Sequence, residues 1–217
     1  MRYLITSSVL VILAASSSSV QGQDWSGFYV GVHGGGSAAT GVNEATLAGG
    51  RLPTFNAGDE IAMSGMLGGV FAGINMMTDT MLLGIEGDVG VGTVEGTFKD
   101  FTFDTESITS TIDWNAHLRG RIGVAVDNAL FYLAGGLAVA SNSVVVDAAN
   151  LGDDEDSAMH VGWTIGGGVE LALTENVVAR AEYLYDDYGS ADYSLFGSNW
   201  SQDINSHTVR VGLSFRP

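Results

Sequence analysis

The clearest pattern along the chain is an alternation of apolar and polar residues between positions 112 and 126. Its two faces hold, respectively, Ile112, Trp114, Ala116, Leu118, Gly120, Ile122, Val124 and Val126, and Asp113, Asn115, His117, Arg119 and Arg121. A period of two indicates a β-strand, because a helix would scatter these charges around its whole circumference. The same alternation in residues 158–173, 177–186 and 205–216 predicts three more strands.

Four glycine-rich segments complete the predicted set of strands, at 25–37, 63–76, 81–94 and 129–144. The connections 77–80, 127–128 and 174–176 are tight, whereas 38–62, 95–111, 145–157 and 187–204 are long and polar. Short turns at one end and long loops at the other are typical of bacterial outer-membrane barrels. The sequence therefore predicts an all-β fold, an eight-stranded antiparallel up-and-down transmembrane β-barrel with short periplasmic turns and long extracellular loops.

The first 22 residues have the pattern of a secretory signal peptide. Arg2 supplies a positive start, residues 3–15 are mostly apolar, and residues 16–22 are mostly small. The apolar stretch is shorter than the roughly 20 residues that a membrane-spanning helix needs. We therefore expect residues 1–22 to be a signal peptide and residues 23–217 to form one barrel domain in the outer membrane of a Gram-negative bacterium.

Opposite charges share the polar face of the predicted strands. They are Glu86, Asp88, Arg119, Arg121, Glu170, Arg180, Glu182 and Arg210. A soluble barrel turns its charged face to water and needs no such balance, whereas a narrow lumen tolerates charges only when they are paired. We therefore predict that the apolar face points outward and that these eight residues form a structural charge network in the lumen.

Aromatic residues are expected near the two membrane interfaces. Counting strand direction from a periplasmic start places Trp25, Phe28, Phe131, Tyr132 and Phe215 near the periplasmic rim. The same count places Trp114, Tyr183 and Tyr185 near the outer rim.

Composition excludes several classes of function. The net charge of −17, from 8 Lys+Arg against 25 Asp+Glu, argues against a nucleic acid partner. The absence of cysteine excludes disulfides, thiolate nucleophiles and cysteine-based zinc sites. The four histidines, His33, His117, His160 and His207, fall on four different strands, so we expect no metal site and no cofactor.

An enzyme is not expected either. A hydrolytic set could draw on Asp203, Ser206 and His207, but adjacent residues on a strand point to opposite faces. The glycines 166–168 lie within a strand pattern, with no helix after them, so they do not form a phosphate loop.

Six segments share a family-like pattern when they are taken together: WSGFYVG (25–31), LRGRIG (118–123), FYLAGG (131–136), GWTIGGGVE (162–170), RAEYLY (180–185) and HTVRVGL (207–213). In combination they resemble the porin-like outer-membrane β-barrel family of alphaproteobacteria. The resemblance spans the whole mature chain and implies a small surface barrel that contributes to envelope integrity, with some relatives acting as surface antigens or haemin-binding proteins. It also implies insertion by the barrel-assembly machinery. One departure is that Phe215 is followed by Arg216 and Pro217, where such chains usually end on an aromatic residue.

The acidic stretch 153–156 is expected in a loop. Its residues either keep that loop solvated or bind divalent cations that bridge to lipopolysaccharide. We expect outer-membrane lipid and lipopolysaccharide as partners, and the oligomeric state stays open. The predicted function is a structural or surface-interaction barrel; the alternative is a narrow porin-like channel or a barrel that binds haemin or another small ligand.

Overall fold

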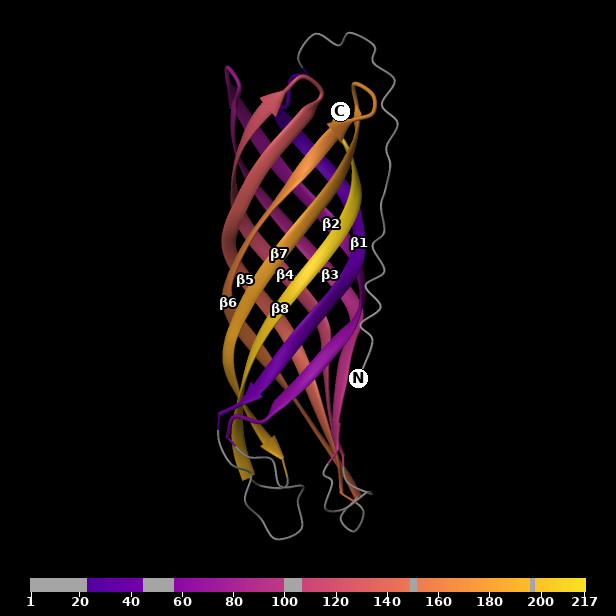
Figure 1. The fold of residues 1–217 in the computed structure, drawn as a ribbon, viewed down its shortest axis with the longest axis vertical. Coiled ribbons are helices and arrows are strands. Elements are labelled where there is room, and N and C mark those ends of the chain that lie inside the picture. Colours follow the sequence, from indigo (N-terminus) through magenta and orange to yellow (C-terminus); the bar gives the residue numbers. More distant parts are fainter. Residues whose placement is uncertain (1–22, 45–56, 100–106, 149–151, 196–197) are drawn as a thin grey trace, which may run out of the picture.

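A closed ring of eight antiparallel strands forms the fold of the computed structural model, which describes residues 23–44, 57–99, 107–148, 152–195 and 198–217 (Figure 1). The strands are β1 (Gly27–Asn43), β2 (Glu60–Thr78), β3 (Met81–Lys99), β4 (Ser107–Val126), β5 (Ala129–Ala148), β6 (Gly152–Ala172), β7 (Val177–Leu195) and β8 (Ser198–Phe215). Each strand pairs with its neighbours in sequence, and β8 pairs with β1. The predicted barrel is confirmed.

The predicted signal peptide, residues 1–22, lies outside the described residues. In the part of the chain that the structure describes, no helix is long and apolar enough to cross a membrane.

Tight turns join the strands at one end of the barrel, as predicted. The β2–β3 turn follows the pair Thr78↔Met81, and its first residue, Asp79, has a φ of 54°. Asp127 opens the β4–β5 turn with a φ of 53°. Aspartate adopts this left-handed conformation more readily than most residues, so the sequence permits a two-residue reversal at both places.

The strands are much longer than predicted, at 17 to 21 residues. Much of the segments 38–62, 95–111, 145–157 and 187–204, predicted as loops, is strand, and only residues 149–151 and 196–197 separate β5 from β6 and β7 from β8. The acidic stretch 153–156 lies on β6. Since about 10 tilted residues suffice to cross a bilayer, each strand continues well beyond it.

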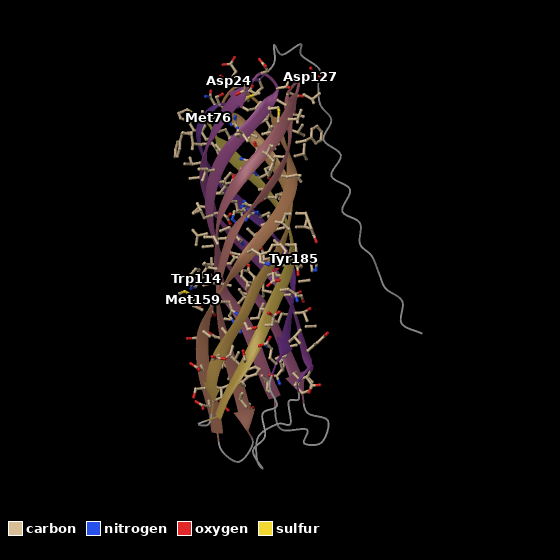
Figure 2. The ribbon with its side chains drawn as sticks, turned by 90° about the vertical axis from the view of Figure 1, so that its left-hand side faces the viewer. Asp24, Met76, Trp114, Asp127, Met159 and Tyr185 are labelled. Carbon is tan, nitrogen blue, oxygen red and sulfur yellow. The ribbon has the colours of Figure 1, made fainter. Side chains whose placement is uncertain are left out.

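The barrel has two parts, which differ in the direction that their apolar side chains face. Trp114, Met159 and Tyr185 lie at a similar height, about midway along the barrel, and Asp24, Met76 and Asp127 lie at the turn end (Figure 2). Between these two levels, apolar side chains face outward; they include Val30, Ile74, Leu83, Ile122, Leu133, Ile165 and Leu213. We call this part the membrane band, and the predicted apolar-out orientation holds there.

Beyond the midway level, in what we call the distal part, the pattern is reversed. Apolar side chains face inward and form one buried cluster of Ala39, Ile61, Met63, Val94, Ile108, Ile112, Ala138, Ala140, Val144, Val146, Tyr188, Tyr193, Leu195, Trp200 and Ile204. Outward positions hold polar residues such as Glu60, Glu95, Thr109, Glu155 and Asp192. The distal part is therefore packed like a water-soluble β-protein.

The prediction that Ile112 shares a face with Trp114 is wrong, because a β-bulge at Asp113 separates them. The pairing of β4 with β5 shifts register between Ile112 and Trp114, which leaves Asp113 as an extra residue. Ile112 consequently points into the distal core, whereas Trp114 is half-buried on the wall. The Asp113 carboxylate accepts a hydrogen bond of 2.7 Å from the Ser143 hydroxyl.

Two of the aromatic residues assigned to the rims are instead buried inside the barrel. Phe28, Phe131 and Phe215 are about half exposed, as interface residues should be. Tyr132 is buried because it stands one position from Phe131 and so points into the lumen. Trp25 precedes β1 and packs under the lumen with Leu82, Leu130 and Val178.

Candidate functional site: a charged layer in the lumen

The eight charged residues predicted for the lumen all lie there, buried within the membrane band. They come from β3, β4, β6, β7 and β8, at positions where the period of two turns the side chain inward. Register brings partners together: Glu86 pairs with Arg119 across β3 and β4, and Glu170 pairs with Arg180 across β6 and β7.

Glu86 stands at the centre of the layer. Its carboxylate accepts hydrogen bonds from Arg119 at 2.5 Å, from Arg180 at 2.5 Å and from Arg121 at 3.3 Å. The hydroxyl of Tyr29 donates to the same carboxylate at 2.7 Å, and Arg121 in turn donates to that hydroxyl. One carboxylate thus ties together four side chains from three other strands.

Glu170 forms a second centre nearer the turn end. Its Oε1 accepts from Arg121 at 2.6 Å and from two nitrogens of Arg180 at 2.6 and 2.9 Å. Its Oε2 lies 3.4 Å from a guanidinium nitrogen of Arg216. Arg216 was not among the residues predicted for the lumen, although the alternation along β8 that turns Thr208, Arg210 and Ser214 inward also turns this position inward.

Glu182 and Asp88 extend the layer toward the distal part. Glu182 accepts from Arg119 at 3.0 Å, from Arg210 at 2.7 Å and from Tyr132 at 2.9 Å. Asp88 accepts from Arg210 at 3.0 Å and lies 3.2 Å from Arg119. Both carboxylates are therefore held by the same two guanidinium groups.

Two histidines and a fifth carboxylate, that of Asp186, extend these contacts along the lumen toward the distal part. His117 Nδ1 lies 2.9 Å from Asp88, and its Nε2 lies 3.3 Å from Asp186. Asp186 also accepts from the Ser206 hydroxyl at 3.1 Å. His33 Nε2 lies 4.0 Å from Asp88. The period of two places His117 on the same face as Arg119, and Asp186 on the same face as Arg180, but the distances between strands could not be read from one sequence.

Guanidinium and carboxylate groups are equal in number in the charged layer. Five guanidinium groups, those of Arg119, Arg121, Arg180, Arg210 and Arg216, face five carboxylates, those of Glu86, Asp88, Glu170, Glu182 and Asp186, and all ten residues are buried. Buried charges persist when they are paired and hydrogen-bonded. Aromatic rings cover the guanidinium groups, since the guanidinium carbons of Arg121 and Arg180 lie 4.1 Å from the ring centres of Tyr132 and Phe71.

Apolar packing covers the charged layer on both sides. Toward the turn end, Trp25 closes the lumen and lies 4.7 Å beneath the guanidinium of Arg216. Toward the outside, the distal core follows directly. A cavity between these regions, beside Asn115 and Tyr188, has a volume of about 10 Å³, room for at most one water. The arrangement is that of a filled lumen.

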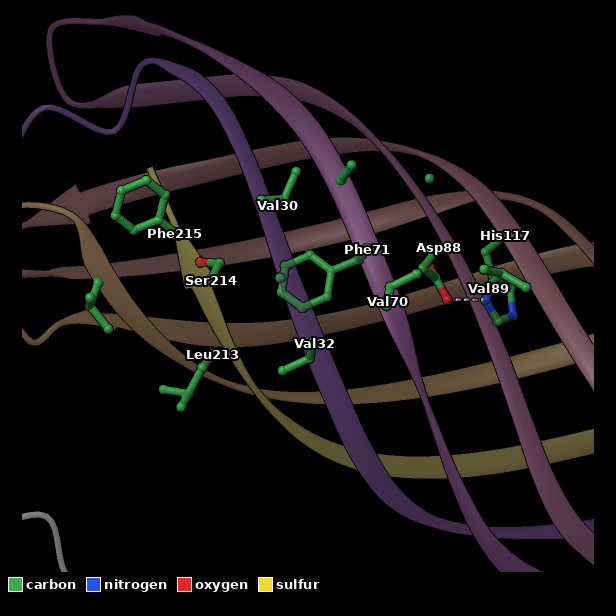
Figure 3. A pocket seen from close by; sticks show the side chains of 14 residues that line it. Val30, Val32, Val70, Phe71, Asp88, Val89, His117, Leu213, Ser214 and Phe215 are labelled. Carbon is green, nitrogen blue, oxygen red and sulfur yellow. Dashed lines mark hydrogen bonds and ion pairs between the residues drawn. The ribbon is translucent and has the colours of Figure 1, made fainter. Parts of the chain in front are cut away.

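A shallow groove of about 830 Å³ lies on the wall over β8, β1, β2 and β3 (Figure 3). Val30, Val32, Val70, Val89 and Leu213 line it, and all five face outward in the membrane band. The groove opens on the apolar outer face of the membrane band, and the buried side chains of Phe71, Asp88 and His117 also line it.

The residues considered for a hydrolytic site lie apart. Ser206 is buried against Asp186, whereas His207 is exposed on the wall, where its Nδ1 lies 2.7 Å from the Tyr183 hydroxyl. The predicted separation of Ser206 and His207 onto opposite faces is confirmed. Within the described ranges, no group of three or more His, Asp or Glu side chains is arranged to hold a metal ion.

Comparison with known proteins places this geometry among outer-membrane proteins. Residues 7–216 match the family described as outer membrane protein beta-barrel domain. The 31 kDa outer-membrane immunogenic protein of Brucella melitensis is 31% identical, over 94% of this chain and 88% of its own. The 22 kDa outer membrane protein of Rhizobium leguminosarum is 29% identical, over 88% of this chain and 78% of its own.

Among solved structures, the outer membrane protein OprG from Pseudomonas aeruginosa has a similar fold. The TM-score is 0.54 at 13% sequence identity, and the match covers 90% of this chain and 98% of that one. At this identity the likeness concerns the fold alone.

Proposed function

We propose that this chain, which belongs to the family of outer membrane protein beta-barrel domains, is a closed barrel that reinforces the envelope and interacts with its surroundings through its outer surface. Its place is the outer membrane of a Gram-negative bacterium, as the family and its relatives show. The relatives include surface antigens, and the membrane band presents the apolar wall that this location requires.

The filled lumen is the observation that carries the proposal. A channel needs a continuous path of water, whereas here an apolar cap, a balanced charged layer and an apolar distal core follow one another along the axis. Eight-stranded barrels are narrow enough for side chains to fill them. A rigid core of this kind stabilises the wall, and it supports a structural role rather than transport or catalysis.

Lipid and lipopolysaccharide are the proposed partners of the wall. Every Arg side chain that the structure describes lies in the lumen, while acidic residues such as Glu60, Glu95 and Glu155 face outward in the distal part. An acidic wall beside anionic lipopolysaccharide favours divalent cations as bridges between them.

Planar-bilayer recording tests the closed lumen. Protein whose folding is verified by heat-modifiable migration on a gel is expected to give no steady conductance in either voltage direction. Large, stable openings would contradict the proposal. In parallel, a haemin titration is expected to leave the Soret band unshifted, and a saturable shift would favour a ligand-binding barrel instead.

A further inference from the structure

Backbone pairing in the wall of the barrel ends early along one line, between the distal halves of β6 and β7. Their backbone pairing ends outward at Trp163↔Asp187, although β6 continues to Gly152 and β7 to Leu195. On their other edges both strands stay paired, β6 with β5 and β7 with β8, out to the last residue. We call residues 152–162 of β6 and 188–195 of β7 the β6–β7 seam.

The hairpins on either side of the seam diverge. The outer ends of the β5–β6 and β7–β8 hairpins lie apart at the foot of the view in Figure 1. The other neighbouring strands of the described wall keep their pairing closer to their outer ends. The seam is thus a particular feature of this wall rather than fraying at every strand end.

Local sequence explains where β7 leaves β6. Gly189 has a φ of 64°, and the pairing of β7 with β8 shifts register between Asp187 and Ser190. Before this bulge the even-numbered residues of β7 point inward, and after it Tyr193 and Leu195 do. At Gly162 any side chain would overlap the backbone of Asp187, and a side chain at Gly189 would come within 3.4 Å of the Val161 carbonyl oxygen, so the two strands stay in contact where their pairing ends.

Single side chains bridge the seam where a neighbouring strand would normally bond. The backbone N–H of Ser194 donates to the Asp156 carboxylate at 2.7 Å. His160 lies with Nδ1 2.9 Å from the Gly189 carbonyl oxygen and Nε2 2.7 Å from the Tyr193 hydroxyl. Backbone groups on a strand edge without a paired strand are a template for another strand.

The two sides of the seam differ in chemistry. Inward, Tyr193 and Leu195 belong to the distal core, and Ala158 packs against it. Outward, Glu155 and Asp192 are exposed in its outer part, Met159 and Val161 are exposed nearer the membrane band, and no outward-facing side chain that the structure describes is Lys or Arg. A strand that fits the seam would therefore present small apolar side chains inward and basic side chains outward.

We propose that the β6–β7 seam binds an extended segment of a partner protein as an added strand, in which basic residues alternate with small apolar ones. Main-chain hydrogen bonds would give the affinity, and the alternation would give the specificity. A second copy of this chain fits poorly, because its own edges carry the same acidic residues. The part of the seam beyond Met159 lies on the distal side of the midway level, and the seam leads onto packed side chains rather than into a cavity.

This inference rests on the proposed surface role, and peptide binding tests it separately from conductance. The probe is a fluorescent peptide of about nine residues that alternates Lys with Val, enough to span the β6 edge. Two controls are a peptide of the same composition with all lysines together and a peptide that alternates Glu with Val. The full chain is used, folded in nanodiscs of zwitterionic lipid without lipopolysaccharide.

The alternating lysine peptide is expected to bind about tenfold or more tightly than either control. It is also expected to slow hydrogen exchange of the seam amides, in residues 155–161 and 190–194, while leaving the paired edge of β8 unchanged. Equal affinity for the two lysine peptides would mean attraction by charge alone and would overturn the proposal. Unchanged hydrogen exchange of the seam amides would also overturn the proposal. The same holds if hydrogen exchange at the seam slows without peptide as the protein concentration rises, because that result indicates pairing between two copies of the chain.

A matched pair of variants locates the site. Glu155→Lys/Asp192→Lys reverses charge at the seam, and Glu60→Lys/Glu95→Lys makes the same change at exposed positions of β2 and β3. The seam variant is expected to lose about tenfold in affinity for the lysine peptide and to gain affinity for the glutamate peptide. Equal losses in both variants would refute the seam as the site. If the seam variant does not fold, the exchange pattern of the unmodified chain decides.

Discussion

Replacing Glu86 by glutamine is the sharpest perturbation of the charged layer. Glu86 is fully buried and holds Arg119, Arg180, Arg121 and Tyr29 through its two oxygens. Glutamine keeps the size and one acceptor oxygen but removes the negative charge, which leaves five guanidinium groups facing four carboxylates. Removing one partner from a buried ion network costs about 3–5 kcal/mol of unfolding free energy.

Reversible urea unfolding in lipid vesicles, followed by tryptophan fluorescence, measures this cost. With an unfolding slope of roughly 2 kcal/mol per molar urea, the midpoint should fall by about 2 M. Glu95→Gln is the matched control, because Glu95 lies on the same strand but is exposed in the distal part, and it should leave the midpoint unchanged.

A second substitution tests whether charge balance is the cause. Arg180→Met combined with Glu86→Gln restores equal numbers of guanidinium and carboxylate groups. The double variant should therefore be more stable than the sum of the two single effects predicts, by about 0.5–3 kcal/mol. Strict additivity, or a Glu86→Gln effect no larger than that of Glu95→Gln, would refute the reasoning.

Three further perturbations test the rest of the architecture. Deleting Asp113 removes the bulge and should turn Ile112 toward water, so limited proteolysis should cut distal β4 in this variant but not in Asp113→Asn. Trp25→Ala should cost about 3–5 kcal/mol in urea unfolding because it empties the cap, whereas Phe28→Ala on the lipid-facing wall should cost clearly less. In bilayers that contain lipopolysaccharide, a chelator should lower the thermal unfolding temperature relative to calcium; identical temperatures would exclude cation bridging.

The membrane band was predictable from sequence because the alternating apolar residues face the same way, outward, throughout it. Apolar residues outward and charged residues inward follow directly from a period of two, and they located Glu86, Arg119 and Arg180 in the lumen. The partners of each charge depend on register between strands, and that information is spread over distant segments. Arg216 was not predicted to lie in the lumen, although alternation along β8 indicates it.

The distal part was not predictable in the same way, because its alternation is reversed and its outward residues resemble loop residues. Ser, Thr and Asp at outward positions make segments such as 145–157 look like connections, although Val144 and Val146 point into a core. Bulges at Asp113 and Gly189 change which residues point inward, and a strict period of two does not reveal them.

The departure at the end of the chain has a structural explanation. Phe215 faces outward as the last residue of β8, and Arg216 turns inward to contact Glu170 and Trp25. The last residues therefore help to close the lumen. Insertion of this chain by the barrel-assembly machinery stays a prediction.

Site-directed spin labelling along β4 tests the central claim most directly, that the lumen is filled and that the wall reverses its polarity at the membrane surface. The chain has no cysteine, so single cysteines at Leu118, Thr109 and Ser110 can each carry a label. The account predicts that a label at 118 is accessible to oxygen from lipid, a label at 109 to a water-soluble relaxation agent, and a label at 110 to neither. Free access of the water-soluble agent to position 110, or lipid exposure at position 109, would contradict it.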